Sequence, residues 1–267
     1  MLDLFRADLK RVVRDRLFLI VCIVAAVLAA TTPLLYWGLG LFEGALEEMG
    51  MFLKLSGRGM FFDAMMPANN MGLILPVFLV ILLCKDFTWG TVRNKIVCGK
   101  TRGQVFLSLF LTSATVTVSV MLAQAVLSSV IGSIIFGFQS MPFTAADFGY
   151  LALSVLFEIL LYVMISALVS LLTVASPNMG VGIVLYVAVN LIFSIIGSIT
   201  TVSLAFAKEP NAILKFLDGA NLFTSTVIGG GDAYTLEQVL YVLVPTLLGS
   251  AGFGAWGYFA FRKKDLK

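Results

Sequence analysis

The stretch Lys85–Gln104, KDFTWGTVRNKIVCGKTRGQ, is a charged, glycine-punctuated interruption between two strongly apolar runs. Taken as a helix from Thr88 to Cys98, it places Trp89, Val92 and Ile96 on one face and polar side chains on the other. A short helix with one apolar face is typical of a segment that lies flat on a membrane surface. We therefore expect a surface helix between two spans.

Both ends of this predicted helix carry local signals. Gly99 is placed as its stop, and the stretch from Thr101 to Gln104 fits a capping box that begins the next helix. Arg93 falls among the apolar residues, about two turns from Asp86, where an unpaired guanidinium is costly. The stretch is thus predicted to be a short helix, a turn and a new helix, with Arg93 paired and marking a docking surface.

The composition is that of an integral membrane protein. Of the 267 residues, 60% are hydrophobic and 12% are charged, whereas soluble domains carry about 25% charged residues. The first apolar run is too long for the core of a signal peptide and no cleavage site follows it, so we expect a permanent span. The prediction is one all-α membrane domain over residues 1–267.

Six apolar runs are candidates for spanning helices, each of which needs about 20 residues. A basic amphipathic stretch, residues 1–16, precedes them and is predicted to lie at the interface. Residues 85–104 form the loop after the second span, and residues 207–238 are predicted to form an extracellular or re-entrant segment. The predicted spans are residues 17–39, 71–84, 105–136, 150–173, 181–206 and 239–261.

Three segments carry packing signals. The outer loop, residues 40–66, holds acidic residues and five methionines, which predicts a second surface-lying segment whose methionines fill the interface. Ser129, Ser133 and Gly137 recur every four residues in the third run, a spacing that lets helices pack closely. The last span holds residues of the same kind: Ser250, Gly254 and Gly257.

Basic residues are distributed unevenly along the chain. Of the 18 Lys and Arg residues, 14 lie before the first span, in the loop 85–104 or after the last span. The other four, on the opposite side, are Lys54, Arg58, Lys208 and Lys215. The positive-inside rule then places both termini and the loop 85–104 in the cytoplasm. The net charge of +3 needs no nucleic-acid partner to explain it.

Polar side chains follow the fourth and fifth spans at intervals of four residues. The connection between these spans is short, so they should be antiparallel neighbours, and the stripes either hydrogen-bond them together or line a translocation path. Glu158 is the best functional candidate, because an ionisable group inside a membrane is costly unless it faces protein or water. The stripes are Ser154, Glu158, Tyr162, Ser166 and Ser170, then Tyr186, Asn190, Ser194 and Ser198; the predicted path residues are Glu158, Tyr162, Asn190, Ser194 and Ser198.

The sequence contains no motif for catalysis. It lacks GxxxxGK[ST], GxSxG, HExxH and CxxC, it has no histidine, and its three cysteines are dispersed. We therefore predict no catalytic residue, cofactor site or metal site, and ATP hydrolysis by the phosphate-loop route is excluded for this polypeptide.

Several features resemble the type-2 permease subunits of ATP-binding-cassette exporters. After the second span come an acidic residue, Gly-Thr-x-Arg and Gly-x-x-Arg; the N-terminus is basic and amphipathic, and the chain closes with an aromatic run and Arg-Lys-Lys-Asp-Leu-Lys. In number and order of spans the similarity covers the whole chain. The loop residues that carry the resemblance are Asp86, Gly90, Thr91, Arg93, Gly99 and Arg102.

The resemblance implies a multi-pass protein of the bacterial plasma membrane. Its loop would be a coupling helix docked on a separate cytoplasmic ATPase subunit, which binds ATP and Mg, and two permease subunits would form the pathway. The family includes lantibiotic-immunity, bacitracin-resistance, sodium-extrusion and multidrug exporters. The implied coupling residues are Asp86, Trp89, Gly90, Thr91, Arg93, Gly99 and Arg102.

Two other functions remain open from the sequence. An ion-coupled secondary transporter that uses Glu158 predicts an internal repeat with broken helices in both halves, and no convincing repeat is found. A non-transporting membrane anchor or immunity protein that sequesters a peptide would leave the loop 85–104 without an energetic role.

Overall fold

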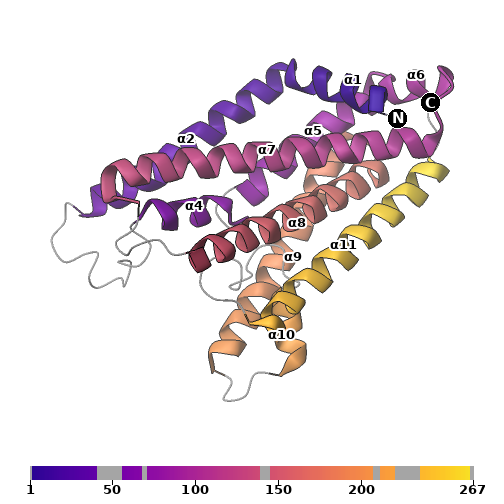
Figure 1. The fold of residues 1–267 in the computed structure, drawn as a ribbon. Coiled ribbons are helices and arrows are strands. Elements are labelled where there is room, and N and C mark those ends of the chain that lie inside the picture. The colour runs from indigo at the N-terminus through magenta and orange to yellow at the C-terminus, as the bar shows by residue number, and fades with distance from the viewer. Residues whose placement is uncertain are drawn as a thin grey trace.

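The chain is described here from a computed structural model. It describes residues 2–40, 56–67, 71–138, 145–206, 211–219 and 235–264, and within these ranges it contains helices and turns but no β-strand. The predicted all-α class is confirmed. The helices are α1 (Leu2–Val13), α2 (Arg16–Gly40), α4 (Gly57–Met65), α5 (Met71–Thr88), α6 (Thr91–Val97), α7 (Arg102–Phe136), α8 (Ala145–Ala175), α9 (Met179–Phe206), α10 (Ala212–Gly219) and α11 (Leu236–Lys263), as Figure 1 shows.

Five helices are long and apolar enough to cross a bilayer, namely α2, α7, α8, α9 and α11. Helices α5 and α6 meet the same criterion only together, as a pair bent by 52°. The described residues therefore hold five candidate spans, or six if the bent pair counts as one. Helix α5 continues to Thr88, beyond the predicted end of the second span at Cys84, because Asp86 in its last turn is buried in protein.

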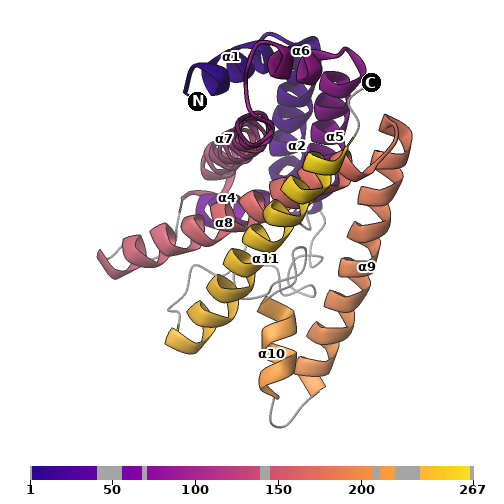
Figure 2. The ribbon, with the colours of Figure 1, turned by 90° about the vertical axis from the view of Figure 1, so that its right-hand side faces the viewer.

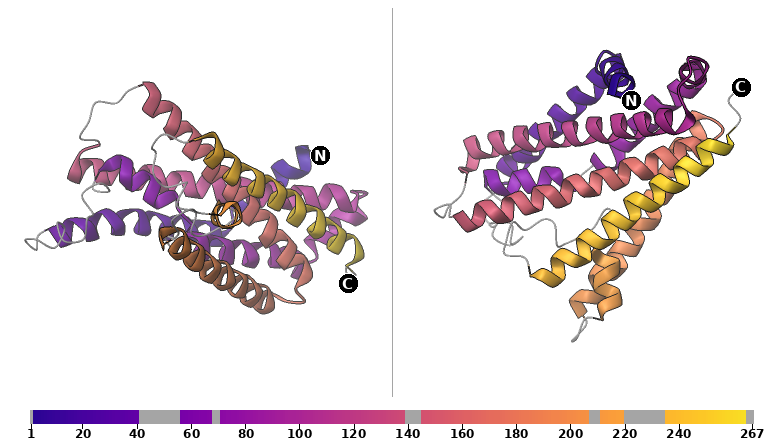
Figure 3. Two further views of the ribbon diagram at one scale, coloured as in Figure 1. Left: turned by 90° about the horizontal axis from the view of Figure 1, so that it is seen from below. Right: turned by 45° about the vertical axis from the view of Figure 1, so that its right-hand side comes forward.

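Helices α5, α7 and α8 form the centre of the bundle, where Leu79, Met121 and Ile165 are fully buried. Helix α7 has 35 residues, about 53 Å at 1.5 Å each, against a hydrocarbon core of about 30 Å. Helix α6 and both ends of the chain lie at the same end of the bundle in both views of Figure 3. This end is called the α6 end below.

Helix α4 is buried, which corrects the prediction that the outer loop 40–66 forms a surface-lying segment. Met60 and Met65 are at most 1% exposed, and α4 lies along α7 in Figure 1. A Cβ on Gly132 would stand 2.6 Å from Met60 Cγ, and Gly57 N donates to Gly137 O over 2.9 Å. The small residues of α7 thus allow close packing, as predicted, and the helix that packs against them is α4. Met49 and Met51 lie outside the described residues.

Helices α9 and α10 lie at the edge of the bundle (Figure 2), and only 11% of the α9 span is buried. Helix α10 falls within the segment predicted to be extracellular or re-entrant, where Lys215 Nζ of α10 lies 2.8 Å from Glu237 Oε1 of α11. Residues 207–210 and 220–234 of that segment lie outside the described residues. Helix α11 starts at Leu236 because Thr235 and Gln238 form a capping box.

Helices α8 and α11 pack closely through glycines on α11. A Cβ on Gly257 would stand 3.0 Å from Phe106 Cζ and 3.3 Å from Leu171 Cα, a backbone atom of α8. A Cβ on Gly254, one turn earlier, would have nothing within 4 Å. Of the two glycines predicted to pack closely, only Gly257 does so in this chain.

This contrast predicts different outcomes for the same substitution. Gly257→Leu should destabilise the protein by about 1–3 kcal/mol, because the added side chain overlaps Phe106 and the α8 backbone. Gly254→Leu is the matched control and should be tolerated, because its side chain points into open space. Thermal unfolding of the detergent-solubilised variants measures the difference. Equal melting temperatures for the two variants would contradict this packing.

Candidate functional site

The junction between α5 and α6 is a sharp turn built on glycine. Gly90 has φ 68 and ψ 11, the left-handed conformation that glycine adopts without steric cost. Helix α6 therefore begins at Thr91, and the predicted helix from Thr88 to Cys98 is too long at its start. Trp89 lies in the turn and is 67% exposed, so its predicted place on the apolar face with Val92 is wrong.

The end of α6 matches the predicted signals. Gly99 has φ 87, its N–H bonds to Ile96 O over 2.9 Å, and Lys100 N–H bonds to Lys95 O over 3.2 Å. These two bonds form a Schellman motif. The capping box between Thr101 and Gln104 then starts α7 with both reciprocal bonds present. The predicted order of short helix, turn and new helix is confirmed.

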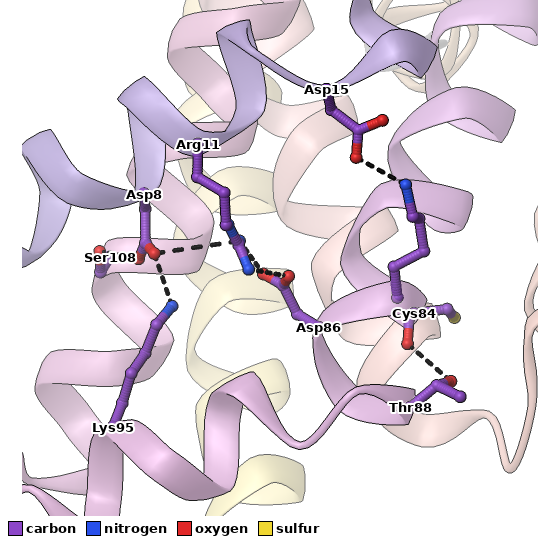
Figure 4. A network of polar contacts seen from close by, with 9 residues as sticks. Asp8, Arg11, Asp15, Cys84, Asp86, Thr88, Lys95 and Ser108 are labelled. Carbon is purple, nitrogen blue, oxygen red and sulfur yellow. Dashed lines mark hydrogen bonds and ion pairs between the residues drawn. The ribbon is translucent and has the colours of Figure 1, made fainter.

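A network of ion pairs holds α6 and the end of α5 against α1 (Figure 4). Arg11 donates two hydrogen bonds to the carboxylate of Asp86, which is 3% exposed. Lys95 Nζ of α6 lies 2.6 Å from Asp8 Oδ1, and Ser108 of α7 donates to the other Asp8 oxygen over 2.7 Å. Four helices thus meet in one buried polar cluster.

A second ion pair joins the start of α2 to the last turn of α5. Lys85 Nζ donates to Asp15 Oδ2 over 2.6 Å, and the Leu17 N–H donates to Asp15 Oδ1 over 3.0 Å. Partial burial disfavours the Asp15 carboxylate, but its bonds from Lys85 and Leu17 hold its pKa below the ordinary value. Because the folded pKa is depressed, this ionisation contributes stability at neutral pH that is lost only as pH falls below about 4.

These contacts change the roles predicted for two arginines. Asp86 is paired with Arg11 and not with Arg93, which is exposed and makes no ion pair with any described residue. Arg102 donates to the carbonyl oxygens of Phe261, Arg262 and Lys264 over 3.3, 2.6 and 3.0 Å. Arg102 therefore caps the last turn of α11, whose carbonyls have no intrahelical partner.

The residues of the loop that remain free for a partner lie on one exposed surface. Trp89 is 67% exposed and Val97 is 77% exposed, and Arg93 is one turn before Val97 on α6. We call these three residues the exposed α6 face. Val97 was missed in the sequence, although its four-residue spacing from Arg93 is a signal that could have found it. Thr91 is half-buried and begins the helix.

A second candidate site lies inside the bundle, along the α8 stripe. Glu158 is 1% exposed and Tyr162 is fully buried, and neither Glu158 Oε2 nor Tyr162 OH has a hydrogen-bond partner among the described residues. Ser166, one turn further on, donates to Thr117 of α7 over 3.2 Å. The α8 stripe therefore faces α7.

The α7 side of this interface adds polar residues that the sequence analysis missed. Gln124 and Ser128 are buried, and Gln124 Oε1 and Ser128 Oγ have no partner among the described residues. Gln124 is seven residues after Thr117, and Glu158 is eight before Ser166, about 10 and 12 Å along antiparallel helices. This register sets Gln124 and Glu158 at the same level. Gln124 and Ser128 are four residues apart, and this spacing is a signal that could have indicated them.

The α9 stripe bonds to α5, which corrects the prediction that the two stripes hydrogen-bond α8 and α9 to each other. Tyr186 OH and Asn190 Nδ2 both donate to Gly72 O of α5. Gly72 O is free because the residue four positions later is Pro76, which has no N–H to donate. Ser194 is half-buried and Ser198 is exposed. Of the five predicted path residues, Glu158 and Tyr162 are buried together on α8, and Asn190 contacts α5.

In the described parts of the chain no group of three or more metal-ligating side chains is found. No family model matches the chain, and no curated protein matches it. The two candidate sites therefore stand on their own geometry.

The ion-pair network makes a testable contribution to stability. Arg11→Ala should lower the free energy of unfolding by about 1–3 kcal/mol, because the buried Asp86 carboxylate loses its charged partner. Adding Asp86→Asn should recover part of the loss, since no buried charge then remains. Thermal unfolding in detergent measures both.

The matched control is Lys215→Ala, which removes an exposed ion pair with Glu237 and should change the melting temperature little. If Arg11→Ala melts at the temperature of the unsubstituted protein, the network does not hold α1 to α5.

Proposed function

We propose that the chain is the membrane-spanning permease subunit of an ATP-binding-cassette exporter. The observation that carries this proposal is the short helix α6, bent away from a candidate span at Gly90. The ion pair between Lys95 and Asp8 ties it to α1. Val97 of this helix and Trp89 of the turn before it are exposed. An exposed apolar residue pair on a rigidly held surface helix suits a docking element.

A docked subunit that moved α6 would transmit this movement directly to the candidate spans. Helix α6 is joined to α5 by a two-residue turn, and through Lys95 and Asp8 to α1. A separate cytoplasmic subunit would bind ATP and Mg and dock on the exposed α6 face. A second permease subunit, of the same or a related chain, would complete the pathway in the plasma membrane. The cargo class would be a hydrophobic or amphipathic compound or peptide.

A second function is favoured by a different observation. Glu158 is buried inside a candidate span with one oxygen unpartnered among the described residues, which suits an ion-coupled secondary transporter. The same carboxyl would serve an exporter as part of its substrate path. A non-transporting anchor or immunity protein would use neither Glu158 nor the exposed α6 face.

The docking surface is tested on the complex. Mass spectrometry of the complex gently solubilised from native membranes should show an ATPase subunit bound to the permease. Val97→Asp and Arg93→Ala should each lower the bound fraction about tenfold or more, because exposed contacts at the centre of an interface carry most of its energy. Both residues are exposed, so the folded yield should not fall.

The matched control is Arg6→Ala, an exposed arginine on α1, which should leave the stoichiometry unchanged. If no ATPase subunit is bound, or if both α6 variants keep it, the exporter proposal fails and the anchor proposal gains.

Glu158→Gln separates the two transport proposals. The amide has the shape of a protonated carboxyl, so the variant should fold normally. In an exporter it should alter substrate-stimulated ATP hydrolysis while transport still requires ATP. In a secondary transporter it should abolish transport driven by an ion gradient, because the amide cannot exchange a proton. Transport assays in liposomes with each energy source distinguish the outcomes, and an unchanged variant removes Glu158 from both sites.

A further inference from the structure

A polar pocket of about 180 Å³ opens at the α6 end, away from the Glu158 cluster, and shares Arg93 with the exposed α6 face. Helices α5 and α6, the connection from α8 to α9 and the end of α11 contribute its walls. Figure 2 shows these ends gathered at the top of the view. The volume is several times the roughly 30 Å³ of a liquid water molecule, so a phosphate group can enter.

The pocket wall is positively charged. Arg93 and Lys264 both line it, and no acidic residue does so among the described residues. Lys264 Nζ donates to Val174 O over 2.7 Å and to Ser176 O over 2.9 Å, and it lies 4.8 Å from the centre of the Phe87 ring. Arg93 makes no ion pair with any described residue. The described lining residues around these two cations are all neutral. Two cations in such surroundings favour the binding of an anion between them.

An unpartnered buried hydroxyl also lines this pocket. Thr173 is 1% exposed, and its Oγ1 has no hydrogen-bond partner among the described residues. A buried hydroxyl without a partner destabilises the folded protein. A ligand oxygen in the pocket would remove that cost.

The start of α9 adds backbone donors to the same wall. Asn178 caps this helix by accepting from Val181 N–H over 2.9 Å, and Met179, its first residue, lines the pocket. The first N–H groups of a 28-residue helix have no intrahelical partner and favour an anion. The start of α9, a buried hydroxyl and two cations thus line the same pocket.

We propose that this pocket binds the phosphate of an anionic phospholipid headgroup. The choice of a lipid rests on the pocket's surroundings. Met179 is 44% exposed and Val184, further along α9, is 67% exposed, so the pocket adjoins an outward-facing apolar surface of a candidate span. The acyl chains would lie along α9 while the phosphate meets Arg93, Lys264 and Thr173.

The probes for the test are dioctanoyl phosphatidylglycerol, dioctanoyl phosphatidylcholine and inorganic phosphate, each titrated against the purified chain in neutral detergent. Native mass spectrometry and thermal unfolding report binding. We expect saturable binding of phosphatidylglycerol and much weaker binding of phosphatidylcholine, whose ammonium group repels the two cations. Competition by inorganic phosphate supports phosphate as the recognised group. Binding of inorganic phosphate without phosphatidylglycerol overturns the assignment to a lipid.

Thr173→Val is the decisive variant, because it removes the hydroxyl and keeps the shape. It should raise the Kd for phosphatidylglycerol by about 2- to 12-fold, and Arg93→Gln should raise it by about 10-fold or more. The matched controls are Thr112→Val, whose hydroxyl is also buried and unpartnered but lies outside the pocket, and Arg6→Gln.

Equal affinity in Thr173→Val and the unsubstituted chain, or equal binding of the two lipids, overturns the proposal. The measurement uses the isolated chain without ATP, so its failure leaves ATPase docking untouched.

Discussion

The buried ion pair between Arg11 and Asp86 is the interaction on which the arrangement of the α6 end depends. Helix α6 has seven residues and buries a single side chain, Val92, so apolar packing alone fixes its direction poorly. The turn at Gly90 is permissive and does not specify an angle. Ion pairs fix the angle between α5 and α6 instead. Asp86 holds the last turn of α5 to α1, and Lys95 holds α6 to the same helix. A buried ion pair often adds little net stability over apolar packing, but it disfavours every arrangement that leaves its charges unpaired. In this chain that selectivity sets the position of a surface helix.

Polar contacts also hold α9 to the bundle, but they are hydrogen bonds to a backbone oxygen and not ion pairs. Between membrane helices lipid is as apolar as the packed side chains, so polar contacts and close packing decide which helices associate. Pro76 cannot donate a hydrogen bond, so Gly72 O is left without its helical partner. Tyr186 and Asn190 donate to that oxygen, which joins α9 to α5 although little of α9 is buried. A proline in one helix thus determines which face of another is turned inward.

Local signals in the sequence predicted what depends on neighbours along the chain. The stop at Gly99, the capping box at Thr101 and the apolar runs each involve residues within a few positions of one another, and the structure contains all of them. Partners distant in sequence were not predictable in the same way. Asp86 had basic candidates at several places, and only the fold shows that Arg11, 75 residues earlier, reaches it. The prediction that the two polar stripes hydrogen-bond to each other was wrong, because a short connection makes two helices neighbours without specifying which of their faces meet.

Buried polar groups in this chain fall into two populations, and the difference bears on function. Near α1 each buried carboxylate has its partner, as for Asp8 with Lys95 and Ser108. Between α7 and α8, and in the pocket at the α6 end, buried oxygens of Glu158 and Thr173 have none among the described residues. Each unmet group costs about 1–3 kcal/mol, and an apolar residue of the same shape would remove the cost. Stability alone therefore favours apolar residues in place of these unpartnered groups. It favours keeping a paired group, because its removal would leave the partner unpaired. Binding of a proton, a substrate or a phosphate would supply the missing partner, which is why both sites are assigned to ligands and the paired network to structure.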